Sequence, residues 1–263
     1  MNNNFFKIIY LLTSMFILCA TSAAFGWHDK THMAVSKAAG HEQWYNSAGP
    51  DVTKTKAGEK EGKNHYCGNH AITEGDKVHE VTADIVLNQV KFNLYDNCID
   101  DEGHLYGAIV ASLNKYIESK REEKKSGKYA GYHLAFCAHY IGDLSMPLHN
   151  VPHGKDKKGP YGKFNQEHHT ENDAIVENND LDQITLQIIG RMDKYKIKKI
   201  TDEHALCQEI AKIATKARNL ACSMVKDKER TITADEAYEQ LAQSAALLKA
   251  VLEYAKQEIA KEK

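Results

Sequence analysis

The chain has 263 residues, of which 42% are hydrophobic and 27% are charged, a balance that fits a soluble globular protein with a substantial core. This length suffices for one large domain or two small ones. Only 4 residues are proline, which suits helices better than a turn-rich β fold. The 14 histidines are more than a domain of this size usually carries, and many of them fall between His28 and His169, which indicates a use for them.

The first 26 residues are typical of a secretion signal. A mostly apolar run over residues 8–20 is followed by small residues, and residues 24–26 (AFG) fit a small-x-small cleavage site. The run is too short for a good membrane span, and a retained anchor is the alternative. We therefore expect cleavage between Gly26 and Trp27 and a secreted or periplasmic mature protein.

The expected mature chain is mildly acidic. Removing residues 1–26 takes away one charged residue, Lys7, which leaves 33 basic and 36 acidic residues and a net charge of about −3 with neutral histidines. A protein that binds a long polyanion usually carries a net positive charge, and this chain does not. This charge favours a small substrate, or one that is held mainly by metal.

Five cysteines remain after this cleavage: Cys67, Cys98, Cys137, Cys207 and Cys222. Export permits disulfides, but an odd number leaves at least one thiol free. Cys137 lies in an apolar segment and is expected to be a small buried residue. No CxxC pair suggests a zinc knuckle.

Helical periodicity dominates the rest of the chain. Thr201 and Thr233 are predicted N-caps, and Thr233 with Glu236 forms a T-x-x-E capping box. β-alternation of useful length, internal repeats, a Gly-rich phosphate loop, G-x-S-x-G and HExxH are all missing from the sequence. We expect an all-α fold, one domain over residues 27–263 with roughly seven to nine helices. The expected helices cover residues 33–40, 78–95, 105–123, 132–150, 167–176, 181–200, 203–228 and 234–261, with a polar loop over 46–69 and a basic loop over 153–164.

The central segment, residues 132–150 (YHLAFCAHYIGDLSMPLHN), carries metal-binding side chains on an apolar background. His139 and Asp143 are four residues apart, so they share one face of a helix. Such groups are costly to bury unless something pairs with them. Pro147 is expected to kink or end the helix, so that His149 can point to a different ion.

Three further pieces offer imidazole and carboxylate groups, which together suit zinc. One is at the expected mature N-terminus, one lies in the polar loop, and one repeats the H-x3-D spacing downstream. They are Trp27 with His32, Asp51 with His65, and His169 with Asp173.

With these residues, the sequence resembles the zinc-dependent phospholipase C and single-strand-specific zinc nuclease superfamily. The resemblance covers residues 27 to about 180. Its most specific parts are HYIGDLSMPLH and the tryptophan at the expected cleavage point. It implies an all-α domain with three Zn²⁺ ions at the bottom of a cleft and zinc-assisted hydrolysis of a phosphate ester.

The resemblance also implies how the ligands divide. Asp143 would bridge two ions, and Asp51 would also orient the attacking water as the catalytic carboxylate. The first ion would take Asp51, His65, His139 and Asp143; the second would take Asp143, His32 and the amine and carbonyl of Trp27; the third would take His149, His169 and Asp173.

The two branches of this superfamily differ in substrate. The short Trp27–His32 spacing and the ending at Asp173 are closer to the nuclease branch, whereas Asn172 stands where nucleases often have an aromatic residue. Met146 stands where the family often has Gln, which alters the lining rather than the ligands. We expect a monomer without a stable protein partner, acting on a phospholipid head group or, alternatively, on single-stranded nucleic acid as an endonuclease or 3′-nucleotidase.

Blander interpretations stand beside this one. The protein could bind zinc without catalysis, or its histidines could be structural. His168 competes with His169, but only His169 has an aspartate four residues on. His133 is expected to be structural or to support a ligand, and Tyr161 and Phe164 either stack on substrate or anchor the basic loop of Lys155, Lys157, Lys158 and Lys163. Six further histidines are expected at the surface rather than as ligands: His28, His70, His79, His104, His153 and His204.

Overall fold

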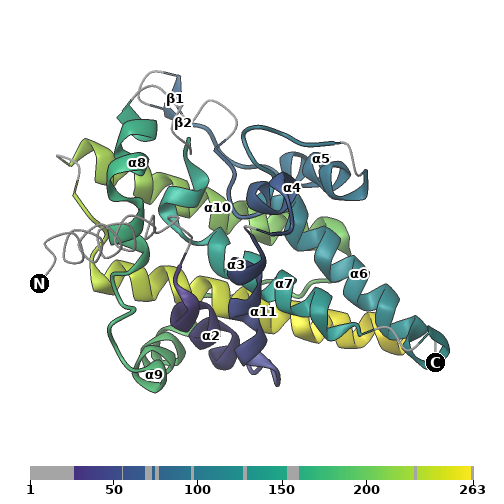
Figure 1. The fold of residues 1–263 in the computed structure, drawn as a ribbon. Helices are drawn as coiled ribbons and strands as arrows, with labels where there is room; N and C mark the ends of the chain where they lie inside the picture. The colour runs from purple at the N-terminus through teal and green to yellow at the C-terminus, as the bar shows by residue number, and fades with distance from the viewer. Residues whose placement is uncertain are drawn as a thin grey trace, which may run out of the picture.

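The computed structural model describes residues 27–54, 56–68, 73–74, 77–95, 98–126, 129–152, 160–227 and 230–261 (Figure 1). These residues form an all-α fold of ten α-helices and two 3₁₀ helices, with one antiparallel pair of two-residue strands. The elements are α2 (Asp29–Ala38), η1 (Trp44–Ala48), α3 (Gly49–Lys54), α4 (Glu59–Lys63), β1 (Thr73–Glu74), β2 (Lys77–Val78), α5 (Ala83–Leu94), α6 (Leu105–Ser126), α7 (Gly131–Leu144), η2 (Pro147–Asn150), α8 (Pro160–Asp173), α9 (Leu181–Met192), α10 (Glu203–Lys226) and α11 (Ala234–Ala260).

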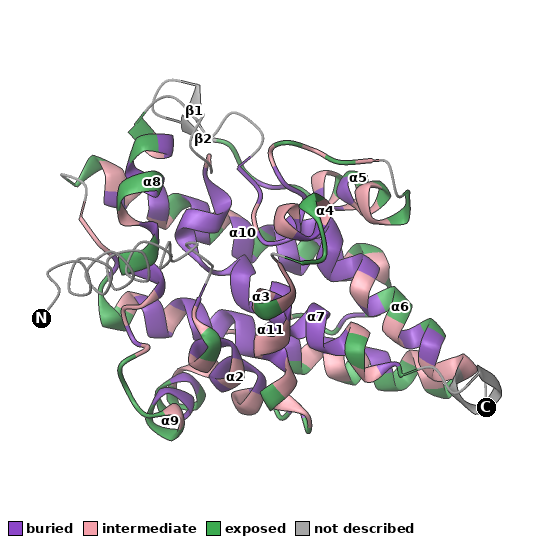
Figure 2. Cartoon of the chain, viewed as in Figure 1, coloured by how far each residue is buried: buried purple, intermediate pink, exposed green. Residues whose placement is uncertain are grey.

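Helix α7 is the central element of the fold. Every residue from Leu134 to Leu144 is buried, and Figure 2 shows this helix almost entirely in the colour of buried residues. It packs against α6, the preceding helix, and against α2, α3 and α11, which come from distant parts of the chain. Burial of a large apolar side chain contributes about 1.5–3 kcal/mol, so the apolar positions of this helix fix it in the core. Its two polar metal-binding residues, His139 and Asp143, are thereby buried as well.

The chain bends after α7, as Pro147 predicts. Met146 is extended, with φ −69° and ψ 117°, and Pro147 then starts η2. The side-chain amide of Asn150 donates to the carbonyl oxygens of Leu144 (2.9 Å) and Met146 (2.8 Å). The first bond satisfies the last carbonyl of α7, which has no partner within the helix. The second ties the end of η2 back to its N-cap residue, Met146. The bend places His149 on η2 rather than on α7.

The two long C-terminal helices begin at side-chain caps. The capping box of Thr233 and Glu236 at α11 is confirmed, and Arg230 adds two hydrogen bonds to the Glu236 carboxylate. The prediction for α10 is wrong by one residue, because Asp202 and not Thr201 accepts the backbone N–H of Ala205 (2.8 Å). A carboxylate at this position also interacts favourably with the positive end of the helix dipole.

The expected loops contain more helix than the sequence pattern indicates. Residues 46–69 were expected to be a loop, but η1, α3 and α4 lie there, which raises the helix count above the expected seven to nine. Pro50 stands in the first turn of α3, where its missing N–H costs nothing, and α4 begins with Glu59 and Glu61 near its positive end. Helices this short lack a readable apolar period. The expected helix boundaries also shift, since α5 starts after its N-cap Thr82 and α9 ends at Met192.

Some expectations concern residues outside the described ranges. Among these residues are the expected signal segment 1–26 and the lysines at 155, 157 and 158 of the expected basic loop. The last residues of that expected loop form the start of α8. In the described residues, no helix is long and apolar enough to cross a bilayer.

The five described cysteines are not joined by disulfides. Cys67, Cys98, Cys137, Cys207 and Cys222 form no disulfide, and all except Cys98 are buried. The prediction that at least one thiol is free is therefore confirmed, as is the burial of Cys137. Burial raises the pKa of the Cys137 thiol to about 12, which makes it an unreactive core residue.

Candidate metal centre

Eight of the predicted ligand side chains converge on the buried end of α7. The structure brings together three groups of histidine and aspartate side chains whose ligand atoms lie within 4.8 Å of one another, and each group can hold a metal ion. The contributing residues are His32 on α2, Asp51 on α3, His65 just after α4, His139 and Asp143 on α7, His149 on η2, and His169 and Asp173 on α8.

Two of these groups share His139, one with His32 and Asp51 and the other with His65 and Asp143. Four of their residues, Asp51, His65, His139 and Asp143, are together called the first cluster. The Nδ1 atom of His65 lies 3.0 Å from Oδ2 of Asp143 and 3.1 Å from Nε2 of His139, and the last two atoms are 3.2 Å apart. Oδ1 of Asp51 lies 3.6 Å from Nε2 of His139 and 3.7 Å from Nδ1 of His65. A tetrahedral zinc ion with bonds of about 2.0–2.1 Å holds its ligand atoms roughly 3.3 Å apart. The atoms from His65, His139 and Asp143 therefore have the spacing of a tetrahedral ligand set, and the Asp51 oxygen lies only slightly farther from the two histidines.

The second oxygen of Asp143 faces a different group of ligands. Its Oδ1 atom lies 3.4 Å from Nε2 of His32 and 3.4 Å from Nδ1 of His149, whereas its Oδ2 atom belongs to the first cluster. The geometry is that of a carboxylate able to bridge two ions. The contact with His149 also links this carboxylate to the remaining group, which contains His149, His169 and Asp173.

The position of His32 depends on a glycine. Its ring stacks on that of His139 with centroids 3.8 Å apart, and a Cβ atom added at Gly142 would lie 2.5 Å from its Nδ1 atom. Any side chain at position 142 would therefore displace the imidazole. The sequence contains this glycine in HYIGD, but the role is visible only once α2 packs on α7.

The third cluster is formed by His149, His169 and Asp173. The Nε2 atoms of the two histidines are 3.3 Å apart, and Nε2 of His169 lies 3.2 Å from Oδ2 of Asp173. The preference for His169 over His168 agrees with this geometry. His168 instead contacts Glu171, 3.4 Å away, at the surface of α8.

Three of the histidines are held by partners on the ring nitrogen that faces away from the cluster. Nδ1 of His139 lies 2.8 Å from the carbonyl oxygen of Ser47, and Nδ1 of His169 lies 2.6 Å from Oδ1 of Asn165. Nε2 of His65 lies 3.2 Å from Oε1 of Glu61. Such partners fix the tautomer and orientation of a metal-binding imidazole. Sequence analysis missed all three, although Glu61 and Asn165 each stand four residues before their histidine.

Burial and neighbouring charges shift the pKa values of these groups. Burial disfavours charged His139, but the carboxylates of Asp51 and Asp143 outweigh it and raise its pKa to about 9. Asp143 is also buried, yet His139 and His149 hold its pKa well below the ordinary value. Burial raises the pKa of Asp173 well above its ordinary value, and the charge of Asp143 adds to the rise. A cation in the third cluster would favour ionised Asp173.

The polar atoms left without hydrogen bonds provide a test of metal fit. In the described part of the chain, neither oxygen of Asp173 has a hydrogen-bond partner, nor do the Oδ1 atoms of Asp51 and Asp143 or the ring nitrogens of His32. Leaving such groups unsatisfied costs about 1–3 kcal/mol each. Metal ions coordinated by them would offset this cost, so the donor set fits the expected ions.

Trp27 is fully buried in the hydrophobic core, just before α2. A residue far along the chain holds the first turn of α2. The Glu177 carboxylate accepts hydrogen bonds from the backbone N–H groups of Lys30 (2.9 Å) and Thr31 (3.2 Å). This anchoring fixes the helix that carries His32. Coordination by the backbone of Trp27 stays a prediction.

A pocket of about 320 Å³ opens beside the clusters. It is lined by His28, Asp29, Asp51, Val52 and Glu177. Asp51 is the cluster residue that reaches this pocket, and its side chain is 8% exposed. This pocket, called the mouth below, therefore borders the first cluster at Asp51. Three carboxylates surround it.

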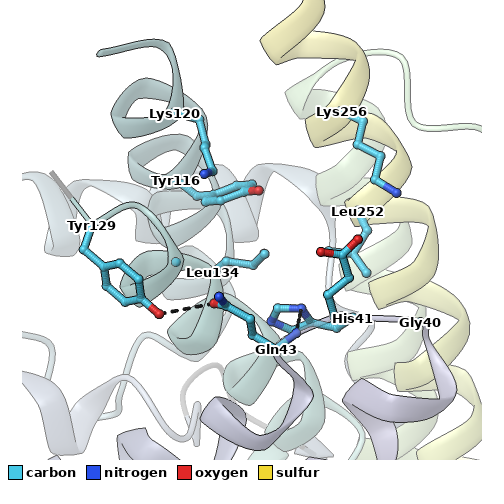
Figure 3. A pocket seen from close by; sticks show the side chains of 11 residues that line it. Gly40, His41, Gln43, Tyr116, Lys120, Tyr129, Leu134, Leu252 and Lys256 are labelled. Carbon is cyan, nitrogen blue, oxygen red and sulfur yellow. Dashed lines mark hydrogen bonds between the residues drawn. The ribbon is translucent and has the colours of Figure 1, made fainter. Parts of the chain in front are cut away.

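Another pocket of about 320 Å³ lies between α6, α11 and the segment after α2 (Figure 3). Tyr129 and Gln43 join across one side of it, where the phenol hydroxyl donates to Oε1 of Gln43 (3.2 Å). Lys120 and Lys256 reach over its opposite walls. The residues that line it belong to none of the three clusters.

The other histidines differ in one respect from expectation. His104 was expected at the surface but is fully buried, with its ring stacked on Phe92 at 5.5 Å, because it stands at the start of the buried helix α6. His79 and His204 are exposed, and His28 and His133 are partly buried. His70 and His153 lie outside the described residues. Phe164 is buried in the core and Tyr161 packs against it, which favours anchoring over stacking on substrate.

Comparison with known proteins adds no assignment. The chain matches no family model, and no curated protein matches it. The functional argument therefore rests on the residues and their geometry.

Proposed function

We propose that the protein is a zinc-dependent phosphoric ester hydrolase of the phospholipase C and zinc nuclease type. The observation that carries the proposal is the convergence of three buried histidine–aspartate clusters around Asp143, with both of its oxygens engaged on different sides. Structural histidines alone do not account for the buried carboxylate oxygens of Asp51, Asp143 and Asp173 that have no hydrogen-bond partner in the described residues.

In this proposal the ligands divide as the family resemblance implies. Asp51, His65, His139 and Asp143 would hold one ion, and His149, His169 and Asp173 another. The remaining ion would take Asp143, His32 and the backbone of Trp27 at a cleaved N-terminus. When bound, zinc lowers the pKa of a coordinated water and offsets charge that develops on the phosphoryl oxygens.

The chain's own residues position the reactants. Asp51 stands between the mouth and the first cluster, so its carboxylate can accept a hydrogen bond from an entering water and orient it towards a phosphate. Ser47 and Asn165 hold the imidazoles of His139 and His169 in fixed orientations. Burial of the clusters excludes other water from them.

The mouth favours a phospholipid substrate. Asp29, Asp51 and Glu177 line it, and like charge opposes the approach of a polyanionic strand. Val52 at the same mouth is 67% exposed and offers an apolar contact to a lipid. The second candidate is a single-strand nuclease or 3′-nucleotidase, which the short Trp27–His32 spacing supports.

One assay separates these substrates. Purified protein beginning at Trp27 is given phosphatidylcholine vesicles and single-stranded DNA in parallel, with Asp51→Asn as the control for dependence on the site. Release of diacylglycerol by the unaltered protein and its loss in the variant support phospholipase C activity. Release of mononucleotides without diacylglycerol would instead identify the protein as a nuclease. Bound zinc without turnover of either substrate leaves a non-catalytic zinc-binding protein.

A further inference from the structure

Helix α4 carries a buried carboxylate that belongs to none of the three clusters. Oε1 of Glu61 lies 3.2 Å from Nε2 of His65, one helical turn further on. The Glu61 side chain is 11% exposed and that of His65 is fully buried. A pair at this spacing on a helix is usually a solvated surface interaction. Here the pair is inside the protein, so its orientation is fixed.

Two further side chains hold the Glu61 carboxylate. The hydroxyl of Tyr140 donates to Oε1 (2.8 Å), and the amide of Asn64 donates to Oε2 (3.2 Å). Tyr140 follows His139 on α7, so the carboxylate is fastened to the helix that carries the first cluster. With His65, three groups hold Glu61 in place.

The geometry determines which nitrogen of His65 can bind a cation. A neutral imidazole has one N–H donor and one acceptor nitrogen. In the tautomer whose Nε2–H group donates a hydrogen bond to Glu61, the lone pair is on Nδ1, which lies 3.0 Å from Oδ2 of Asp143 and 3.1 Å from Nε2 of His139. The partners of His139 and His169 are a neutral carbonyl and a neutral amide. Glu61 instead places a negative charge behind its ligand.

We propose that Glu61 is a positioning residue for the first metal site. It fixes His65 in the tautomer whose Nδ1 faces the ion, and its charge strengthens that nitrogen as a ligand. Outer partners of this kind typically change metal affinity by about 10–100-fold. The inference rests on the proposed function, because it requires that the first cluster binds zinc.

Glu61→Gln is the most informative variant. Glutamine keeps an oxygen that can accept a hydrogen bond from the Nε2–H group of His65, and it removes the negative charge of the carboxylate. Its amide nitrogen would meet the amide of Asn64, but Oδ1 of Asn64 has no hydrogen-bond partner in the described residues, so that amide can turn over and accept. The fold is therefore expected to persist. Glu59→Gln is the matched control, because Glu59 is exposed on the same short helix.

The measurement is zinc affinity by competition with a chromophoric chelator, together with the thermal midpoint of the metal-free protein. The visible spectrum of the cobalt-substituted protein reports the ligand field independently of activity. We expect Glu61→Gln to bind one ion about tenfold more weakly and to shift the cobalt spectrum, with a metal-free midpoint equal to that of Glu59→Gln.

Three results would overturn the inference. Wild-type affinity and an unchanged cobalt spectrum in Glu61→Gln would show that the charge does not act on the ion. A loss of zinc matched by an equal loss of stability in the metal-free protein would make Glu61 a purely structural residue. An unaltered protein that binds no zinc would remove the proposed function and this inference with it.

Discussion

Replacing Gly142 with alanine tests how closely α2 and α7 must approach to build the site. The new Cβ atom would lie 2.5 Å from Nδ1 and 2.9 Å from Cε1 of His32. Ordinary contacts between such atoms begin near about 3.5 Å, so the ring must move by roughly 1 Å. The His139 ring stacked 3.8 Å away on His32 restricts that movement.

A shift of this size is large for a metal ligand. Zinc–nitrogen bonds are about 2.0–2.1 Å long, so a nitrogen displaced by roughly 1 Å no longer coordinates. Overpacking costs about 1–3 kcal/mol, against a helix-propensity gain of about 0.5–1 kcal/mol for alanine over glycine. We therefore expect Gly142→Ala to lose one zinc and to have a lower thermal midpoint.

Gly190→Ala on α9 is the control, because a Cβ atom there meets nothing within 4 Å. It should raise stability slightly and keep all the metal. The assay is elemental analysis of both purified variants beside their melting curves. If Gly142→Ala kept full zinc and gained stability as the control does, the close packing of His32 on α7 would be refuted.

Further outcomes follow from the same geometry. Asp143→Asn should remove more than one zinc, since each oxygen faces a different group of ligands, and loss of a single ion in elemental analysis would argue against a bridge. In the metal-free protein His139 has its pKa raised from 6.5 to about 9, so its protonated form stabilises the fold fully below about pH 6.5 and this contribution is lost as the pH rises through 9. The melting temperature of metal-free protein should therefore fall over that range, and a flat profile would contradict the assignment of its partners. An extra residue before Trp27 should weaken one zinc site, because the terminal amine becomes an amide; unchanged zinc content would exclude Trp27 as a ligand.

Local patterns predicted the parts of the site that lie within one helical turn. His139 with Asp143 and His169 with Asp173 follow from the H-x3-D spacing, and the bend at Pro147 follows from its missing N–H. The all-α class followed from periodicity in the long helices. These features depend on neighbours close in sequence.

Long-range packing decided the rest. The meeting of Asp51 and His65 with α7 was expected from the family resemblance, not from spacing. The contact of Gly142 with His32 joins helices that are distant in the chain. His104 is buried where the start of α6 packs on α5, a tertiary contact that the local sequence pattern does not reveal. The short helices α3 and α4 owe their form to tertiary packing and first-turn chemistry, which periodicity over so few residues does not reveal.

Elemental analysis of the mature protein after mild purification without chelators tests the central claim most directly. Three groups of histidine and aspartate side chains predict about three zinc ions per chain. Chelation should remove these ions and abolish phosphodiester hydrolysis. A protein that is folded and pure but carries no stoichiometric metal would contradict the account.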